Sequence, residues 1–274
     1  MVFSTDGFVC RVMDTGGSEK YIRLITPTRG RLQVLVQGGK SPKSGRTACS
    51  QLFIWGNYEI GEENGRYWLQ TGSVNHVFSK LPEDLAAFSL ASYLCEAAEE
   101  LTDEGETTEG LLRLLLNCMY GLDLRLYPLS QIKAVFELRA AVLSGYCPEL
   151  STCRACGRDC TDTDETVYAD VMDGALLCAH CLTAAHADAP APTALAADEV
   201  REASVLYPLT PHALAAARFV RQAPLRRVLS FRLERAADLA SFSAFAENYL
   251  LHHLGRGFQT LQFYKEVERH DKNR

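Results

Sequence analysis

The sequence contains no stretch that would carry the chain into or across a membrane. No apolar run approaches the roughly 18 residues that a membrane-spanning helix needs. Met1 is followed by Val2-Phe3-Ser4-Thr5-Asp6, without the apolar segment of a signal peptide. We therefore expect a protein of the cytoplasm, where a reducing environment keeps thiols free.

Motifs for common catalytic chemistries are also missing. There is no Gly-x-x-x-x-Gly-Lys phosphate loop, no His-Glu-x-x-His metal pair and no nucleophile elbow. His252 and His253 are adjacent, so they face different sides of a helix and make a poor metal pair. These absences predict that the chain is not an enzyme.

Positive charge is too scarce for a uniformly basic nucleic-acid binder, because the formal net charge is −6. The charge is unevenly spread along the chain. Residues 1–80 carry a net +4, residues 81–150 a net −8, residues 151–200 a net −7 and residues 201–274 a net +5. Two positive terminal portions that flank a negative middle permit a polyanion to bind at one face.

Ten cysteines are present, and four of them form a recognisable pattern. Cys153-x-x-Cys156 is followed, after 21 intervening residues, by Cys178-x-x-Cys181, which is one residue longer than the usual zinc-ribbon spacing. Each pair offers two sulfurs to one ion, because a tight turn such as one at Gly157 folds the backbone under the metal. Four thiolates satisfy Zn²⁺ and leave no open position, so the spacing predicts one structural zinc per chain.

Other chemistries are compatible with this pattern. The cysteines could form a disulfide framework, a thioredoxin-like redox pair or the ligands of an iron–sulfur cluster. Cys160 adds a further alternative: it could replace Cys156, which would leave six residues inside the first pair and a 17-residue gap to Cys178. His180 lies between two predicted ligands and is expected to point outward.

Residues 1–80 have the pattern of short β-strands. Polar and apolar residues alternate over residues 31–38, as in a half-buried strand, and residues 21–27, 52–55 and 67–70 continue the pattern. Glu63-Asn64-Gly65-Arg66 predicts a hairpin turn. Residues 38–46 are predicted to be a flexible basic loop. Five or six short strands in about 80 residues predict a small barrel.

From Pro82 onward the hydrophobic period becomes that of helices. One helix is predicted to begin near Pro82. Further helices are predicted at residues 110–120, 130–145, 211–222 and 233–254. Residues 184–197 are rich in Ala, Asp and Pro and predict a mobile linker. The polar span 161–173 has too few apolar residues for a core of its own, so metal binding is expected to supply much of its folding free energy.

Basic residues of the first 80 positions are candidates for contact with a nucleic acid. They lie in or beside two predicted loops, and the second loop has three cations among Gly, Ser and Pro with no acidic residue between them. Phosphate contact at such a loop needs no base specificity, whereas the alternative is solvated surface charge. The candidate DNA-binding residues are Arg29, Arg31, Lys40, Lys43 and Arg46.

Several other side chains could either bind a partner or serve only as core or solvated surface. Five aromatic residues could stack on bases, although most are better explained as barrel core: Phe53, Trp55, Tyr58, Tyr67 and Trp68. A second basic surface, or else a solvated helix face, is formed by Arg218, Arg221, Arg226 and Arg227, with Arg232 and Arg235 nearby. This set, or Lys133, could dock an acidic peptide tail. The acidic run 96–109 is expected to be a solvated helix end and loop.

Ordered motifs along nearly the whole chain resemble those of RecO-type DNA repair proteins. The start is similar in Arg29-Gly30-Arg31 and in the Gly-Gly-Lys-Ser-Pro-Lys-Ser run at 38–44. The middle is similar in Phe136-Glu137-Leu138-Arg139 and in the Gly-Tyr-Cys-Pro-Glu-Leu run at 145–150, followed by Cys-x-x-Cys-Gly. The end is similar in Leu-Ser-Phe-Arg at 229–232 and Leu-Gln-Phe-Tyr-Lys at 261–265.

This resemblance implies an α+β chain with three parts. They are an N-terminal OB-fold barrel at residues 1–80, an α-helical domain at 81–150 and 183–274, and an inserted zinc knuckle at 151–182. The resemblance also implies a non-enzymatic mediator of recombination, at the nucleoid, that binds single- and double-stranded DNA and anneals complementary strands. It would act with a RecR-type partner and would help to load recombinase onto DNA coated by single-stranded-DNA-binding protein, whose C-terminal tail it would dock. A zinc-stabilised adaptor that binds only proteins, or an enzyme that uses the thiols, remains the alternative.

Overall fold

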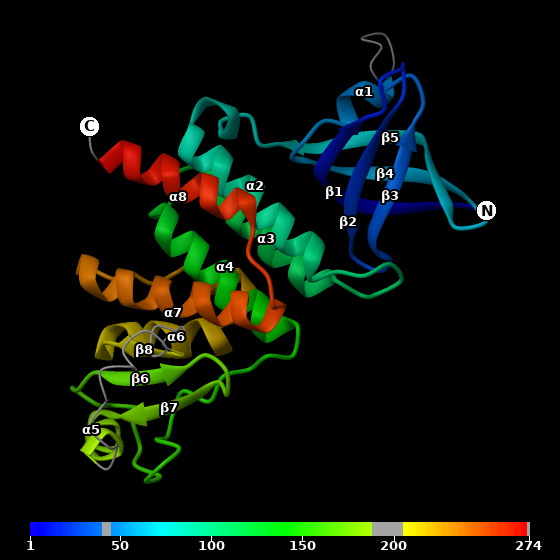
Figure 1. Ribbon diagram of the computed structural model, residues 1–274. Helices are drawn as coiled ribbons and strands as arrows, with labels where there is room; N and C mark the ends of the chain where they lie inside the picture. The colour runs from blue at the N-terminus through cyan, green and yellow to red at the C-terminus, as the bar shows by residue number, and fades with distance from the viewer. Residues whose placement is uncertain (40–44, 188–204, 273–274) are drawn as a thin grey trace, which may run out of the picture. The chain divides into compact units, whose positions relative to one another are not determined.

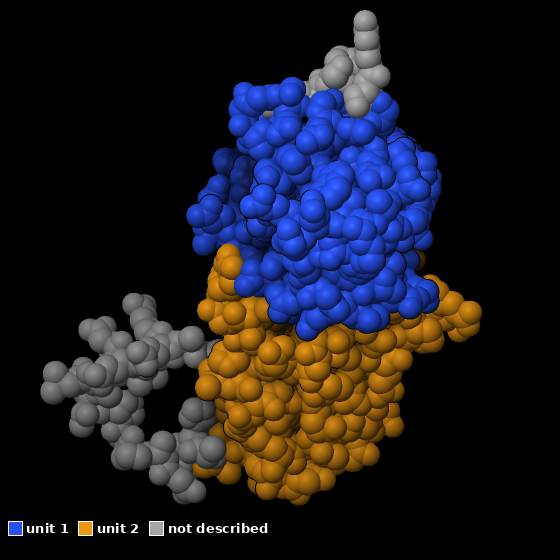
Figure 2. Space-filling view, turned by 90° about the vertical axis from the view of Figure 1, so that its right-hand side faces the viewer, with its two compact units in different colours: residues 1–126, 258–274 blue, residues 127–257 orange. Residues whose placement is uncertain are grey.

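The computed structural model describes residues 1–39, 45–187 and 205–272. Contacts divide the chain into two compact units, which Figure 2 colours separately. The first unit holds residues 1–126 and 258–274, and the second holds residues 127–257. The three-part division at residues 80, 150 and 182 stays a prediction, and each compact unit is described by itself.

Five strands of the first unit close into a barrel (Figure 1). They are β1 (Val2–Asp14), β2 (Lys20–Thr26), β3 (Gly30–Val36), β4 (Ile54–Glu63) and β5 (Arg66–Val77). The order is β1-β2-β3-β5-β4, and β4 pairs back onto β1. Only the β3–β5 pair is parallel among these strand pairs. The predicted barrel of OB type is therefore confirmed.

Alternation along the strands fills the barrel. In β3, Leu32, Val34 and Val36 are buried and Gln33 is exposed, so one face of the strand forms core while the other meets solvent. The short helix α1 (Gly45–Cys49) lies between β3 and β4, and the buried Tyr58 hydroxyl donates to the Cys49 carbonyl at 2.8 Å. The prediction of a loop over residues 38–46 is therefore wrong for the last two residues, while residues 40–44 lie outside the described ranges.

Three helices complete the first unit. They are α2 (Leu85–Glu100), preceded by the short 3-10 turn Leu81–Glu83, α3 (Glu109–Asp123) and α8 (Gln259–Lys272). Asp84 caps α2 by accepting from the amides of Ala86 and Ala87. The chain returns at its end to pack α8 on α2 (Figure 1), where the Tyr93 and Phe258 rings lie 5.6 Å apart. The helix α8 was not predicted from the sequence.

The acidic run 96–109, which spans the end of α2 and the loop that leads to α3, packs on the barrel. Gly30 pairs with Glu104 as an isolated antiparallel bridge, and the Gly105 amide donates to the Arg29 carbonyl at 3.0 Å. Glu99 is only 3% exposed and pairs with Arg11 at 3.2 Å and with Arg23 at 3.0 Å. The expectation of a solvated helix end is therefore wrong for Glu99, because two barrel arginines bury its carboxylate.

Helices and a small sheet form the second unit. The helices are α4 (Leu129–Leu143), α5 (Ala179–Ala187), α6 (Pro211–Gln222) and α7 (Ala236–Leu254), with a 3-10 turn at Leu225–Arg227. The strands β6 (Val167–Asp170), β7 (Ala175–Cys178) and β8 (Leu206–Leu209) pair antiparallel in the order β7-β6-β8. This sheet was not predicted, since β8 is distant in sequence from the two strands that it completes. Most of the predicted linker, residues 188–197, lies outside the described residues.

Two further features concern the cysteines and the helices. All ten cysteines are free thiols, so the described structure contains no disulfide framework. In the described ranges, no helix combines the length and the apolar character that a membrane crossing demands.

Candidate functional site

Four cysteines from two segments meet in the second unit. Cys153 and Cys156 follow α4, Cys178 ends β7, and Cys181 lies in the first turn of α5. Their sulfur atoms all lie within 4.8 Å of one another. The structure thus brings together all four residues that the sequence spacing singled out.

This cluster has the size of a single tetrahedral metal centre. With Zn–S bonds of about 2.3 Å, two sulfurs of a tetrahedron are roughly 3.8 Å apart. The sulfurs of Cys156 and Cys178 are 3.9 Å apart. The donor set contains sulfur alone, and His180 is exposed as expected. Both the donors and their spacing fit Zn²⁺.

Local backbone geometry prepares the first cysteine pair for a metal. Gly157 has a φ of +70°, which favours glycine, and its amide donates to the Cys153 carbonyl at 2.9 Å. Burial by itself raises the pKa of Cys153, but the amides of Cys178, Cys156 and Ala155 outweigh burial and lower this pKa to about 6. The thiolate, which is the form that binds metals, is therefore favoured.

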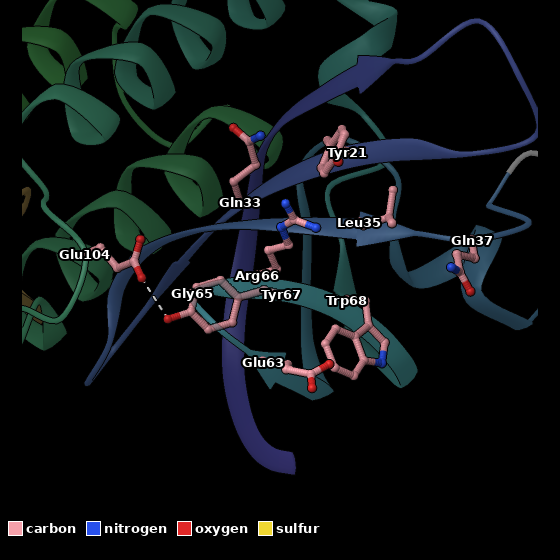
Figure 3. A pocket seen from close by; sticks show the side chains of 10 residues that line it. All are labelled: Tyr21, Gln33, Leu35, Gln37, Glu63, Gly65, Arg66, Tyr67, Trp68 and Glu104. Atoms are coloured by element: carbon pink, nitrogen blue, oxygen red, sulfur yellow. Dashed lines mark hydrogen bonds between the residues drawn. The ribbon is translucent and has the colours of Figure 1, made fainter. Parts of the chain in front are cut away.

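A groove of about 630 Å³ lies on the barrel face formed by β2, β3 and β5 (Figure 3). In OB folds this face is the one that binds oligonucleotides. The parallel register places Trp68 of β5 beside Leu35 of β3, and Tyr21 of β2 pairs with Leu35 across the next strand. The remaining lining residues are Gln33, Gln37, Glu63, Gly65, Arg66, Tyr67 and Glu104.

Glu104, a residue of the acidic run, lies at one end of the groove. The Tyr67 hydroxyl donates to a carboxylate oxygen of Glu104 at 2.7 Å (Figure 3). This hydrogen bond is the main cause that raises the pKa of Tyr67 to about 12. Glu63 and Glu104 carry two negative charges against the single positive charge of Arg66. The groove is therefore more acidic than basic, although it is rich in aromatic surface.

Arg29, a predicted DNA contact, is engaged with the protein beside the groove. Its guanidinium carbon is 3.8 Å from the centre of the Phe3 ring, and Glu62 pairs with it at 3.2 Å. The Phe3 ring in turn meets the Tyr67 ring edge-on, with 6.3 Å between the centroids. Arg29 therefore supports, through Phe3, an aromatic residue that lines the groove.

The other predicted DNA contacts of the barrel are placed as follows. Arg31 donates to the Glu99 carbonyl at 2.7 Å and lies 3.9 Å from a carboxylate oxygen of Asp103. Arg46 donates to the Gln70 carbonyl at 2.8 Å. Lys40 and Lys43 lie outside the described residues. None of the three described arginines lines the groove.

Sequence reasoning missed several residues of the groove. It named Tyr67 and Trp68 among possible stacking residues but left out Tyr21, Gln33 and Arg66. The period-two pattern already assigns Gln33 to the outer face of its strand, and that signal could have found it. The parallel β3–β5 pairing that gathers these residues has no local signature.

The second predicted basic surface divides into two kinds of residue. Arg218 donates to the Thr161 carbonyl at 2.7 Å, and Arg221 donates to the Pro148 carbonyl at 2.8 Å. These two arginines hold the segments that flank the first cysteine pair. The exposed members of the set are Arg226, Arg227, Arg232 and Arg235.

Lys133 is buried rather than offered to a peptide tail. Its ammonium group lies 2.9 Å from Glu137 and 2.7 Å from Glu247, and its side chain is 4% exposed. Burial lowers the pKa of Lys133, but the two glutamates outweigh burial and raise this pKa above its ordinary value. The sequence-based suggestion that Lys133 docks an acidic tail is wrong, because both of these partners belong to the chain itself.

Two family models match the chain. The model for the N terminal of recombination protein O matches residues 1–78, and the model for its C terminal matches residues 82–262. The first therefore covers the barrel strands, and the second covers the helices from α2 to α7 and the four cysteines.

Curated proteins named DNA repair protein RecO are similar in sequence. The protein of Alkaliphilus metalliredigens is 28% identical over 181 residues, which cover 66% of this chain and 72% of the relative. The protein of Acetivibrio thermocellus is 27% identical over 178 residues, covering 65% and 70%. The protein of Bacillus subtilis is 27% identical over 181 residues, covering 66% and 69%.

Proposed function

The chain belongs to the RecO family, whose members take part in DNA repair and recombination, and on this basis we propose that it binds DNA and anneals complementary strands. The observation that carries the proposal is the aromatic groove on the barrel face. In this proposal the groove takes the bases of a single strand, and no covalent step is catalysed.

The composition of the groove favours bases over phosphates. Tyr21, Tyr67 and Trp68 offer aromatic faces, and stacking of a base on an aromatic side chain contributes about 1–3 kcal/mol whatever the base. Glu63 and Glu104 would repel phosphate from the same space. The sugar-phosphate backbone would therefore keep away from the two glutamates and approach Arg66.

Phosphate contacts would add affinity without sequence preference. Arg66 lies at the β4–β5 turn, and Lys40 and Lys43 stay predictions for the same role because they lie outside the described residues. Binding through stacking and phosphate contact tolerates any sequence. Such tolerance suits an annealing protein, which must hold two strands before their bases pair.

The family resemblance supplies further partners for this proposal. We infer a RecR-type partner, the C-terminal tail of a single-stranded-DNA-binding protein, and help in loading recombinase onto coated DNA. Exposed Arg226 and Arg227, with Arg232 and Arg235 nearby, are candidates for contact with an acidic tail or with additional DNA. Each of these partners is open to a direct pull-down with the purified protein.

We also infer that Cys153, Cys156, Cys178 and Cys181 hold one Zn²⁺. The metal would supply a closed structural crosslink between the first cysteine pair and the β7–α5 junction. Arg154, inside the first pair, also ties that loop to the β6–β7 turn: it donates to Asp173 at 2.6 Å and pairs with Asp170 at 2.9 Å. In this proposal the centre stabilises the second unit and takes no part in DNA chemistry.

One observation favours a second candidate function, that of an adaptor which binds only proteins. Arg29, Arg31 and Arg46, three of the predicted DNA contacts, are engaged with the chain itself. An adaptor would show no salt-dependent affinity for DNA. Annealing of labelled complementary oligonucleotides at two salt concentrations, with and without single-strand binder, separates the two functions.

The two tryptophans of the chain allow a sharper test, because one lines the groove and the other does not. Trp55→Phe leaves Trp68 as the only tryptophan, and Trp68→Phe leaves Trp55. Addition of single-stranded DNA should quench the fluorescence of the Trp55→Phe variant strongly and that of the Trp68→Phe variant weakly. Equal quenching in both variants, or none in either, would count against the groove.

A further inference from the structure

Cys160 is a fifth cysteine beside the four-cysteine cluster. It is 1% exposed, and its sulfur lies 3.5 Å from the Arg158 carbonyl oxygen. It does not belong to the group whose sulfurs all lie within 4.8 Å of one another. Since Zn²⁺ is satisfied by four thiolates, the proposed metal centre leaves this thiol without a role.

The pairing of the cysteine loop places Cys160 on the metal side. Thr152 and Asp159 form an antiparallel bridge, the Cys153 amide donates to the Arg158 carbonyl at 2.9 Å, and the Cys160 amide donates to the Ser151 carbonyl at 2.7 Å. Side chains on either side of a bridge pair point to the opposite face from the pair itself. Cys153 and Cys160 are therefore diagonal neighbours on one face.

Electrostatics agrees with this placement. Burial raises the pKa of the Cys160 thiol, and the charges of Cys153 and Cys178 raise it further. The thiol is thus close enough to the cluster to interact with its charge.

Cys156 is the most exposed member of the cluster. Cys153 and Cys178 are buried, Cys181 is half-buried and Cys156 is exposed. Cys156 lies between Cys153 and Cys160 in the same loop, next to the turn at Gly157. An exchange of Cys156 for Cys160 would therefore change the conformation of one loop and leave the other three sulfurs in place.

We propose that Cys160 is a reserve metal ligand that takes the coordination position of Cys156 when an electrophile removes the Cys156 thiolate. The inference rests on the zinc centre proposed above. With iodoacetamide, the Cys156 sulfur forms a bond to carbon and iodide leaves, while its bond to zinc breaks. The Cys160 thiol releases its proton to solvent and its sulfur bonds to zinc, so the ion keeps four thiolates and an unchanged charge.

A plain alternative is that Cys160 is a small buried hydrophobic residue. The two interpretations predict different numbers of thiolates on the metal in a protein that lacks the Cys156 thiol. Charge-transfer absorbance of a cobalt-substituted centre reports the number of thiolates on the metal. Cys156→Ser should keep the absorbance of the wild type, whereas Cys156→Ser/Cys160→Ala should lose about a quarter of it, because one of four thiolates is gone.

The matched control is Cys156→Ser/Cys118→Ala. Cys118 is buried in α3 of the first unit, so this variant also loses one buried thiol but keeps Cys160. It should behave like Cys156→Ser. If Cys156→Ser already shows the three-thiolate absorbance of the Cys160 double variant, the reserve-ligand proposal is overturned.

A second measurement avoids the loss of Cys156 from the folding chain. Zinc-loaded wild type and Cys160→Ala are alkylated with iodoacetamide until mass mapping finds Cys156 modified, and bound zinc is then measured. We expect the wild type to keep its zinc and Cys160→Ala to release it. Equal release from both overturns the reserve role, whereas a wild type that never holds zinc overturns the proposed metal centre instead.

Discussion

The indole of Trp68 lies so close to Gly61, its cross-strand partner on β4, that a Cβ added at Gly61 would come within 2.2 Å of the ring. A contact of this length is not sterically possible, so the absence of a side chain at Gly61 is what allows Trp68 its place in the barrel wall. The indole also lines the groove on β2, β3 and β5. A glycine on one strand thus sets the position of the main stacking surface on the next.

Gly61→Ala should displace Trp68 and weaken binding of single-stranded DNA. The added methyl group must push the indole aside, at a cost in unfolding free energy of about 1–3 kcal/mol, as is usual for overpacking. Urea unfolding and fluorescence anisotropy measure the two effects. Gly17→Ala is the control, because a Cβ there meets nothing within 4 Å. If the Gly61 and Gly17 variants bind DNA equally, Trp68 is not held by Gly61.

Trp68 and Arg66 should affect DNA binding in different ways. Trp68→Ala removes a stacking surface and should weaken binding by about 1–3 kcal/mol, or roughly 5- to 150-fold, with little change in salt dependence. Arg66→Ala removes one phosphate contact and should reduce the slope of log K against log salt by about 0.7. Anisotropy titrations at several salt concentrations measure both. A changed slope in the Trp68 variant alone would reverse the two roles.

Glu104→Gln should strengthen binding of single-stranded DNA at low salt. The change removes a negative charge from the groove while the amide oxygen still accepts from Tyr67, so a gain of about 0.5–1 kcal/mol, or roughly 2- to 5-fold, is expected. The pKa of Tyr67, raised to about 12 mainly by its hydrogen bond to Glu104, should fall. Ultraviolet titration follows this tyrosine. Glu106→Gln, an exposed change in the same loop, should do neither.

Lys133→Met should destabilise the second unit at neutral pH. Two carboxylates lose a buried cation, which typically costs about 3–5 kcal/mol. Because the folded pKa of Lys133 is raised, its contribution is complete below the ordinary lysine value and is lost as the pH rises through the folded value. The stability difference between wild type and variant should therefore shrink above pH ~10.4. Urea unfolding against pH measures it, and the exposed change Lys80→Met should show no such difference.

Removal of zinc should unfold the cysteine segment without abolishing annealing. Structural zinc supplies folding free energy, so a chelator or Cys153→Ser should lower the thermal midpoint of the second unit. Annealing should persist at temperatures where the protein stays folded, because the groove belongs to the first unit. Calorimetry with and without chelator, beside the annealing assay, measures both. Normal stability together with lost annealing would contradict a structural role.

Local sequence patterns predicted many elements of this structure. The two Cys-x-x-Cys pairs identify their four residues by spacing alone, because a short chelating turn demands it. Alternation over residues 31–38 indicates a strand with one buried face, and most helices follow from a period that any segment displays by itself. Such signals depend on neighbours within a few residues, so they are readable before the chain folds.

Long-range contacts escaped the same reasoning. The sequence suggested Lys133 as a dock for an acidic tail, but the fold places Glu247 of α7 2.7 Å from its ammonium group. The helix α8 lies on α2, where the Thr260 hydroxyl donates to the Glu96 carboxylate at 2.5 Å. These two residues are 164 positions apart in the sequence. Arg29 stays a predicted DNA contact, but its contacts with Phe3 and Glu62 could not be read from the sequence. In each case at least one partner is distant in sequence, and the residues nearby in the sequence do not reveal that partner.

The sequence by itself determined that the chain carries a small barrel, helices and a four-sulfur cluster, since periodicity and spacing are properties of short segments. The tertiary structure alone decided which aromatic residues share a groove, because the parallel pairing of β3 with β5 sets Trp68 beside Leu35. It also decided which charges remain at the surface. A charge is neutralised wherever folding brings an opposite charge within about 4 Å, and only the packed chain fixes those distances.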